Sequence, residues 1–238
     1  MRKLQFIILG CILLLSGCED KKKTFETPEQ TVSEADSGSS VEKEKEDKKP
    51  SVRYPKITNE NAVSFLTEYG EENPETKVRI ETYFGEIDIE LYRDTPLHRA
   101  NFIYLVKQGY FDESVFHRVV PEFIIQAGNS DTRNTQEKRA ELGKDYLLPA
   151  EIIKGRIHEY GTVSGAKEYR ENPDNRSAPY EFFIFLGPNT SARHLNGSYT
   201  IFGRVVKGMD VVETISEIET DSEEWPLQNI YIKAYVLE

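Results

Sequence analysis

The strongest structural signal in the chain is the stretch Phe116-His117-Arg118-Val119-Val120-Pro121-Glu122-Phe123-Ile124-Ile125-Gln126-Ala127-Gly128-Asn129. Two apolar, β-prone runs flank a proline there, a pattern typical of a β-hairpin. Arg118 lies in the first run and Gln126, eight residues later, in the second. Even spacing places side chains on one face of a strand, although a turn at Pro121 can change that phase. We therefore expect a guanidinium and a carboxamide beside an aromatic patch, where they can hold a peptide carbonyl while a small apolar ring is buried.

This stretch resembles the signature of the cyclophilin family of peptidyl-prolyl cis/trans isomerases, Phe-His-Arg-(Val/Ile)-(Val/Ile)-Pro-x-Phe-x-x-Gln-x-Gly, which carries the catalytic arginine. Further matches follow in the family's order over roughly Lys77 to Leu237. Asn101-Phe102 matches, Glu181-Phe182-Phe183-Ile184 is similar to Gln-Phe-Phe-Ile, and the run from His194 to Gly203 is similar to Trp-Leu-Asp-Gly-Lys-His-Val-Val-Phe-Gly. The alternative is a β-hairpin whose arginine forms an ordinary salt bridge.

The resemblance implies a mainly β fold, a closed eight-stranded antiparallel β-barrel capped by two α-helices, with the substrate groove on its outer face. The residues agree with this class, because short alternating runs are separated by turn residues. Strands are expected over Val78 to Phe84, Ile87 to Tyr92, Gly161 to Ala166, Glu181 to Leu186, Tyr199 to Val206 and Asn229 to Leu237, and a short helix over Met209 to Ile215. Another helix is expected from Thr95, as its N-cap, and Pro96, at its first position, to Gly109.

We expect four segments along the chain. They are a signal peptide over 1–17, a lipidated cysteine and disordered charged tether over 18–53, a helical extension over 54–76, and the cyclophilin-like isomerase domain over 77–238. The extension should contain a helix from Asn59 to Tyr69 that ends at Gly70. A long polar loop is expected from Asn129 to Asp145.

The activity that the resemblance implies is rotation about X-Pro peptide bonds. Rotation breaks no bond, so neither a cofactor nor a metal is expected, and the four histidines lack the spacing of metal ligands. His117 should support Arg118, and the other histidines should lie at the surface or the groove rim. The family's catalytic positions fall on Arg118, Gln126 and Phe123, and its substrate-binding positions fall on Ile124, Ala166, Lys167, Glu181, Phe183, His194, Leu195 and Tyr199.

Several of these positions depart from the family pattern. Glu181 replaces a glutamine, His194 replaces a tryptophan, and Ala166-Lys167 stands where relatives carry Ala-Asn or Ala-Arg. The polar stretch from Lys167 to Tyr180 is longer than expected. We expect weak binding of cyclosporin, which packs on the missing tryptophan, and a Glu181 carboxylate that pairs with Arg118 and weakens its field.

The N-terminus has the features of a secretory signal. Met1-Arg2-Lys3 is basic, and the apolar run from Leu4 to Leu15 is shorter than the ~20 residues that span a bilayer. Leu15-Ser16-Gly17-Cys18 resembles the bacterial lipobox, which implies a lipid on Cys18 and attachment to a membrane of the cell envelope, on its periplasmic or outer-membrane side. The alternative is an ordinary signal peptide that contains a cysteine. The second cysteine, Cys11, would leave with the signal.

The expected partners are proline-containing polypeptides and, through Cys18, a membrane. A net charge of −11 with no basic stripe argues against nucleic acid. We expect a monomer. The main alternative function is a non-catalytic peptide-binding or chaperone module on the same scaffold, because a fold does not guarantee activity.

Overall fold

The structure, a computed structural model, describes residues 54–168 and 171–238. The helices are α1 (Ala62–Glu72), α2 (Pro96–Lys107), α3 (Arg133–Leu142) and α4 (Met209–Ser216). The strands are β1 (Lys77–Thr82), β2 (Gly85–Leu91), β3 (Val115–Val120), β4 (Ile124–Asn129), β5 (Thr162–Gly165), β6 (Phe182–Phe185), β7 (Ile201–Lys207), β8 (Ile230–Tyr231) and β9 (Lys233–Leu237).

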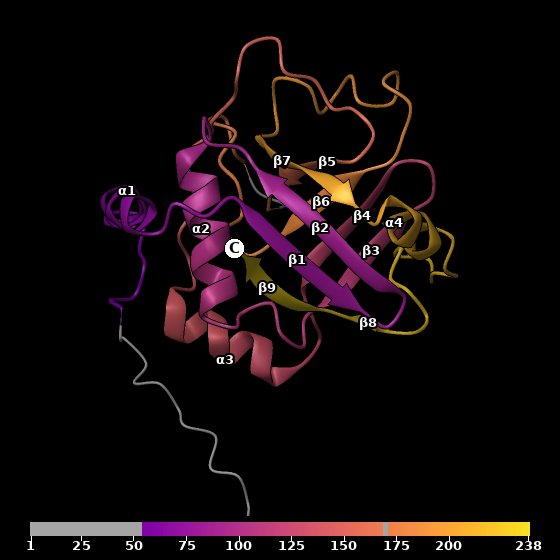
Figure 1. Cartoon of the computed structure of the whole chain (residues 1–238), viewed down its shortest axis with the longest axis horizontal. Helices are drawn as coiled ribbons and strands as arrows, with labels where there is room; N and C mark the ends of the chain where they lie inside the picture. Colours follow the sequence, from indigo (N-terminus) through magenta and orange to yellow (C-terminus); the bar gives the residue numbers. More distant parts are fainter. Residues whose placement is uncertain (1–53, 169–170) are drawn as a thin grey trace, which may run out of the picture. The chain divides into compact units, whose positions relative to one another are not determined.

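The strands form one antiparallel sheet that curls almost into a closed barrel (Figure 1). Their order is β8-β3-β4-β6-β5-β7-β2-β1-β9, so the two outermost strands are successive in the chain. The mainly β barrel expected from the sequence is confirmed, with nine strand segments instead of eight. The extra segment arises because the last expected strand is interrupted at Ile232, whose backbone bonds with Glu113 and Ser114. The chain there changes its partner from β3 to β1.

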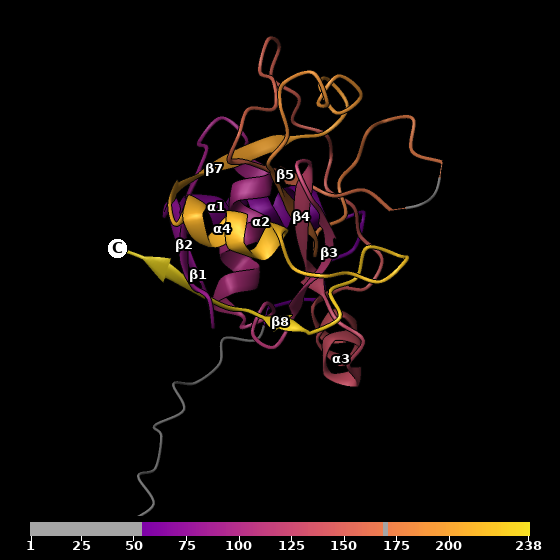
Figure 2. The same cartoon turned by 90° about the vertical axis from the view of Figure 1, so that its right-hand side faces the viewer.

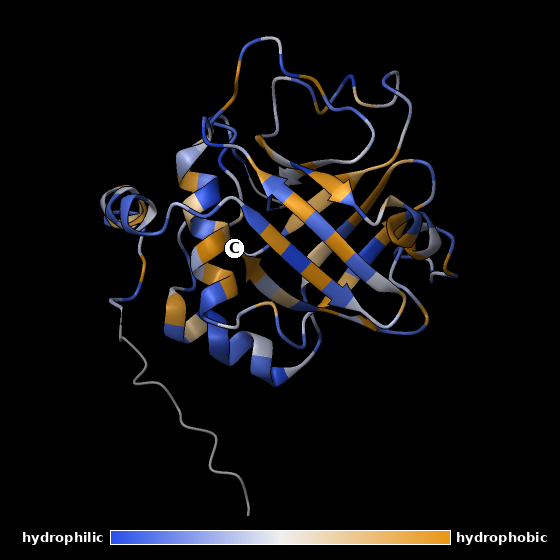
Figure 3. Ribbon diagram, viewed as in Figure 1, coloured by the Kyte–Doolittle hydropathy of each residue, from blue (hydrophilic) through white to orange (hydrophobic). Residues whose placement is uncertain are grey.

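Alternating side chains build the core inside the barrel. In β1 and β2, Val78, Ile80, Ile87 and Ile89 are at most 1% exposed, while their neighbours face outward, as the banding of these strands shows (Figure 3). Helices α2 and α4 lie at opposite ends of the barrel (Figures 1 and 2), in agreement with the two capping helices expected. The outer face of the barrel is therefore left open on the side of β3, β4 and β6.

The cap of α2 differs from the expectation. Pro96 begins the helix, but the Thr95 side chain makes no capping hydrogen bond to it. Instead, the Glu151 carboxylate accepts hydrogen bonds from the backbone N–H groups of Leu97 at 3.0 Å and His98 at 2.9 Å. A carboxylate suits this position, because free N–H groups and the helix dipole both favour negative charge. No sequence pattern indicated a capping partner more than 50 residues farther along the chain.

Two expectations about local structure were wrong, the end of the first helix and the loop after β4. Helix α1 does not end at Gly70 but continues to Glu72. Gly70 serves close packing, since an added Cβ would lie 3.0 Å from the Cβ of Ala100 on α2. The expected loop from Asn129 to Asp145 contains the polar helix α3, which is held by hydrogen bonds from Lys138 to the backbone carbonyls of Gly109 and Asp112.

The segment before β1 packs on α2 through aromatic rings. Tyr54, Phe65 and Tyr69 each lie with their ring centroids 5.2–5.6 Å from that of Tyr104, in edge-to-face geometry. Arg99 of α2 donates to the carbonyl oxygen of Gly70 at 2.8 Å. Within residues 54–168 and 171–238, no helix is long and apolar enough to cross a bilayer.

Candidate active site

A row of side chains crosses three neighbouring strands on the outer face of the barrel. Arg118 of β3 pairs with Gln126 of β4, and Gln126 pairs with Phe183 of β6. The residues on either side of Gln126, Ile125 and Ala127, face the core and are 0% exposed. The prediction that Arg118 and Gln126 share one face is confirmed.

His117 joins this face through an irregularity in β3. The register passes from Phe116 opposite Ala127 to Arg118 opposite Gln126, so His117 is the extra residue of a β-bulge. Its Nε2 lies 3.4 Å from Gln126 Nε2 and 3.5 Å from Glu181 Oε2. The bulge therefore allows two successive side chains, His117 and Arg118, to reach the same site.

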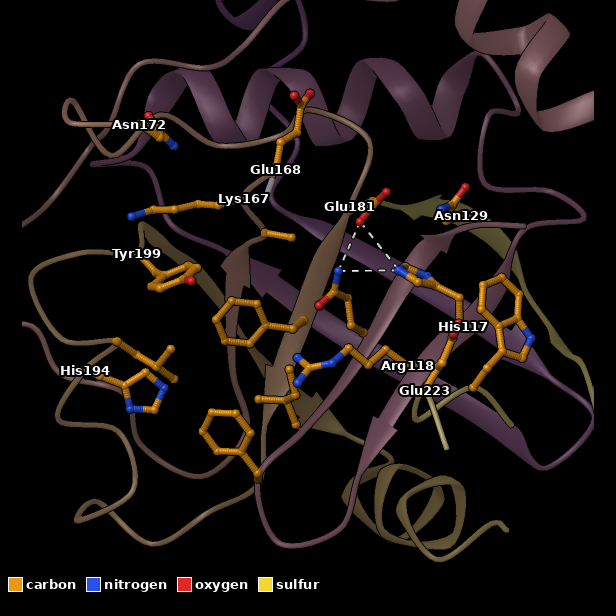
Figure 4. A pocket seen from close by; sticks show the side chains of 17 residues that line it. His117, Arg118, Asn129, Lys167, Glu168, Asn172, Glu181, His194, Tyr199 and Glu223 are labelled. Carbon is orange, nitrogen blue, oxygen red and sulfur yellow. Dashed lines mark hydrogen bonds and ion pairs between the residues drawn. The ribbon is translucent and has the colours of Figure 1, made fainter. Parts of the chain in front are cut away.

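The face is hollowed into a groove of about 760 Å³ (Figure 4). Every candidate site residue lines it except Cys18, which lies outside the described residues: Arg118, Phe123, Ile124, Gln126, Ala166, Lys167, Glu181, Phe183, His194, Leu195 and Tyr199. Further lining comes from His117, Asn129, Glu168, Asn172, Glu223 and Trp225. Segments that are far apart in the sequence thus contribute to one site.

One part of the groove is an apolar notch. Ile124, Phe183 and Leu195 are at most 4% exposed and pack as a cluster on the outer face, with Phe123 and Tyr199 against them. The rings of Phe183 and Tyr199 meet edge to face with centroids 5.6 Å apart. An apolar ring buried here gains about 1.5–3 kcal/mol.

Arg118 extends from β3 toward the middle of the groove (Figure 4). Its Nε donates to Oε2 of Glu224 over 2.6 Å, and its side chain remains 30% exposed. The expectation that Glu181 pairs with Arg118 is therefore wrong, because the neighbouring carboxylate is that of Glu224. Glu224 follows α4 in the chain, at a distance in sequence that no local pattern reveals.

Glu181 instead belongs to a network on the other side of Gln126. Its carboxylate accepts hydrogen bonds from Gln126 Nε2 at 3.0 Å and from Nη2 of Arg139, on α3, at 3.2 Å. Burial opposes ionisation, but the hydrogen bond and charge of His117 and the charge of Arg139 outweigh it and hold the pKa of Glu181 below its ordinary value. A buried carboxylate of this kind is kept charged by its partners.

This network also orients Gln126. An ionised carboxylate only accepts hydrogen bonds, so the amide nitrogen of Gln126 must face Glu181. The amide oxygen is then the group that Gln126 can offer to a peptide in the groove. His117 Nδ1 is buried and has no hydrogen-bond partner in the described part of the chain, whereas Nε2 lies 3.5 Å from Oε2 of Glu181.

Lys167 lies at the end of the groove away from His117 and Glu223 (Figure 4). Its Nζ lies 4.4 Å from the ring centroid of Tyr199 and donates to Oδ1 of Asn175 at 2.6 Å. Burial lowers the pKa of Lys167. Ala166, beside it, is 3% exposed, and its N–H bonds to the carbonyl oxygen of Glu181. A cation over an aromatic ring can contact the backbone or an acidic side chain of a bound peptide.

Several residues of the site were missed by sequence reasoning. Arg139 lies in the segment expected to be a loop, and Glu224 and Trp225 lie in an acidic stretch between α4 and β8. Trp225 packs against His117 with ring centroids 5.7 Å apart. It is the only tryptophan in the chain, which was a signal that could have drawn attention to it.

Two histidines lie elsewhere than expected. His98 and His158 are 3% and 0% exposed, so their assignment to the surface or rim was wrong. His98 bonds with Glu151 and Ser177, and His158 stacks on Phe183 behind the notch. Among the residues that the structure describes, no group of three or more His, Cys, Asp or Glu side chains could hold a metal ion.

Comparison with known proteins identifies the family. The family model described as cyclophilin type peptidyl-prolyl cis-trans isomerase/CLD matches residues 77–236. A peptidyl-prolyl cis-trans isomerase of Acinetobacter baylyi is 35% identical over 150 residues, which are 62% of this chain and 75% of that protein. The isomerase ppi1 of Schizosaccharomyces pombe is 37% identical over 164 residues, which are 67% of this chain and 98% of that protein.

The fold of this chain is also similar to a solved structure of the family. The crystal structure of a cyclophilin type peptidyl-prolyl cis-trans isomerase from Cryptosporidium parvum superposes with a TM-score of 0.58 at 27% sequence identity, over 69% of this chain and 98% of that one. The family match over residues 77–236, the shared fold and the groove on its outer face therefore occur together in one chain. The chain belongs to the cyclophilin-type peptidyl-prolyl cis-trans isomerase family and is an isomerase of that class.

Proposed function

We propose that Arg118 accelerates rotation about X-Pro bonds by stabilising the twisted amide. A planar peptide bond resists rotation by about 18–20 kcal/mol, because the nitrogen lone pair is delocalised into the carbonyl. At an X-Pro bond the two isomers are close in energy, yet they exchange in about 10–100 s without a catalyst. The enzyme must therefore bind the twisted state better than either planar state.

A guanidinium meets that requirement. In the twisted state the nitrogen becomes pyramidal and its lone pair is localised, so a donor directed at it gains an interaction that neither planar isomer offers. A guanidinium carries five N–H donors and no acceptor, and Arg118 keeps its terminal N–H groups for this role, since only its Nε is bonded to Glu224. Gln126 holds a backbone group of the substrate through its amide oxygen.

The observation that carries this proposal is the position of Arg118 in one groove with an apolar notch. The notch of Phe123, Ile124, Phe183, Leu195 and Tyr199 holds the proline ring while the preceding carbonyl turns. Arg118, Gln126 and Phe183 are cross-strand neighbours, so the sheet keeps donor, acceptor and notch in fixed relation. The substrate class is proline-containing polypeptide, and a Cryptosporidium parvum relative that is 28% identical was crystallised in the presence of the dipeptide Ala-Pro.

The test is an isomerisation assay on the purified protein. Exchange between cis and trans forms of a proline-containing tetrapeptide is followed by NMR, with and without enzyme. The proposal predicts acceleration that depends on Arg118, whereas a non-catalytic peptide-binding module would bind the peptide without changing the exchange rate.

We also propose that the protein is a lipoprotein of the bacterial cell envelope and works as a monomer on folding envelope proteins. The support is the lipobox-like Leu15-Ser16-Gly17-Cys18 after an apolar run with a basic start. The chain has two cysteines, Cys11 and Cys18, so loss of the signal would leave Cys18 alone. Stable anchoring needs more than one acyl chain.

Intact-mass analysis tests the lipid anchor. The mature protein should begin at Cys18, carry the mass of two or three acyl chains and sediment with membranes. A Cys18→Ser variant should lack the added mass and be released. Cleavage at another residue with no added mass would support an ordinary signal peptide instead.

A further inference from the structure

Glu224 contacts β3 in two ways. Its carboxylate Oε2 accepts a hydrogen bond from Arg118 Nε at 2.6 Å, and its backbone carbonyl accepts one from the N–H of Val119 at 2.9 Å. The loop that carries it is closed on itself, because the N–H of Asp221 donates to the carbonyl of Trp225 at 2.8 Å and the N–H of Trp225 donates to the Asp221 carboxylate at 3.0 Å. The carboxylate is thus held at a fixed place beside the Arg118 side chain.

The contact with Glu224 leaves the two terminal nitrogens of Arg118 available to a substrate. Only Nε is engaged, and in the part of the chain that the structure describes Arg118 makes no other side-chain hydrogen bond or ion pair. The guanidinium is planar, so a hydrogen bond from Nε–H restrains the orientation of its terminal nitrogens as well as the side chain that carries it. The planar terminal group is then directed into the groove.

We propose that Glu224 is a positioning residue for the isomerisation, which acts by holding the Arg118 guanidinium toward the substrate amide. This proposal rests on the proposed role of Arg118. It assigns a function to the loop between α4 and β8, on the far side of the groove from Lys167.

The charge of Glu224 could also oppose catalysis by neutralising Arg118. Two features reduce that effect. The Glu224 side chain is 42% exposed, so water screens its charge. Its contact is with Nε, and the terminal nitrogens that face the groove are farther from it. The gain in rate from a guanidinium held in place therefore exceeds the loss from its partly neutralised charge. Removing the Glu224 carboxylate should thus slow the reaction.

The backbone of Glu224 permits a clean test. Its φ is 67°, in the left-handed region that favours glycine. Glu224→Gly removes the carboxylate and relieves the backbone, so the loop should keep its shape. Glu113 has a similar φ of 70° away from the groove, and Glu113→Gly is the matched control for the glycine substitution. Glu219→Gln controls for loss of one negative charge in the same loop.

The experiment measures kcat and KM of the purified full chain on a proline tetrapeptide. Glu224→Gly should lower kcat/KM roughly tenfold, mainly through kcat, as expected when a reacting group is misplaced. Glu224→Gln keeps an acceptor for Nε and should lose less. Glu113→Gly and Glu219→Gln should retain the wild-type rate. The order parameter of the Arg118 Nε–H, from ¹⁵N relaxation, should fall in Glu224→Gly.

A second background separates positioning from a general effect on the fold. In Arg118→Lys there is no Nε–H for Glu224 to hold, so adding Glu224→Gly should change kcat/KM little. An equal loss in both backgrounds, or no loss in wild type, would overturn the proposal. If Arg118→Lys itself is as fast as wild type, the role of Arg118 fails; if only Arg118→Lys is slow and Glu224→Gly is not, the role of Glu224 alone fails.

Discussion

Glu181 and Gln126 are joined across β6 and β4 by a hydrogen bond of 3.0 Å from the Gln126 amide nitrogen to the Glu181 carboxylate. The same carboxylate bonds with Arg139, and both charged side chains are less than 20% exposed. A glutamine at position 181 could accept or donate, whereas the carboxylate can only accept. The departure from the family pattern at Glu181 therefore fixes the amide of Gln126 and depends on a cation from α3.

Glu181→Gln tests this relationship. It leaves the buried Arg139 without a charged partner, although Arg139 still donates to the Tyr110 hydroxyl and the Gly128 carbonyl, so the free energy of unfolding should fall by up to about 3 kcal/mol. The rate constant kcat/KM should not rise, because the carboxylate next to Arg118 is that of Glu224. Chemical denaturation and the isomerase assay measure the two effects. The double variant Glu181→Gln, Arg139→Met should lose less stability than the single variants together. A faster enzyme with unchanged stability would mean that Glu181 acts on Arg118 after all.

His158 should make stability depend on pH. Burial lowers its pKa, and the hydrogen bond with Asn196 only partly offsets that effect. In the unfolded chain, with a histidine pKa near 6.5, His158 therefore binds a proton at a higher pH than it does in the folded protein. The free energy of unfolding should be highest above pH ~6.5 and should decrease as the pH falls below that value. The decrease should end once His158 is protonated in the folded protein too. Denaturation curves at a series of pH values measure it. A His158→Gln variant with the same pH dependence as wild type would contradict this account.

Trp225 should report substrate binding directly. It is the only tryptophan of the chain and lines the groove beside His117. Titration with a proline-containing peptide should change its fluorescence with a saturable curve. The same peptide with alanine in place of proline should bind more weakly, because the notch then loses the ring that it buries. Absence of any fluorescence change at peptide concentrations that saturate the enzyme in NMR would place the peptide away from Trp225.

Cyclosporin should bind weakly. The family's tryptophan is replaced by His194, whose ring lies 5.6 Å from that of Phe123. Trp225 does not substitute for it, since it packs against His117. Inhibition of the isomerase reaction should require micromolar drug or more, and His194→Trp should tighten inhibition by at least about tenfold, or ~1.4 kcal/mol. A nanomolar inhibition constant for the wild-type protein would rule this out.

The resemblance implied the barrel and its outer groove, whereas the common face of Arg118 and Gln126 was predicted from the residues themselves, for a local reason. The runs around Arg118 and Gln126 alternate in a hairpin, and a hairpin brings its residues together whatever the rest of the chain does. Phe183 joined them through its match to a family segment, and the structure places it opposite Gln126.

The residues that escaped prediction act over long sequence distances. Glu151 caps α2 from 53 and 54 residues away, and Glu224 bonds with Arg118 from 106 residues away. Neither carboxylate lies in a periodic pattern, so only the complete fold brings it to its partner. The polar helix α3 was missed because it has no apolar stripe, and its stability comes from side chains such as Lys138 that bond with neighbouring backbone.

The most direct test of the account is the rate of cis/trans exchange of a proline peptide with wild-type protein and with Arg118→Ala. Both proteins should fold and bind the peptide, since the notch is unchanged. In the Arg118→Ala variant kcat/KM should fall by about 10²-fold or more, the loss expected when a charge-stabilising donor is removed. Equal exchange rates for the two proteins, with peptide bound in both, would contradict it.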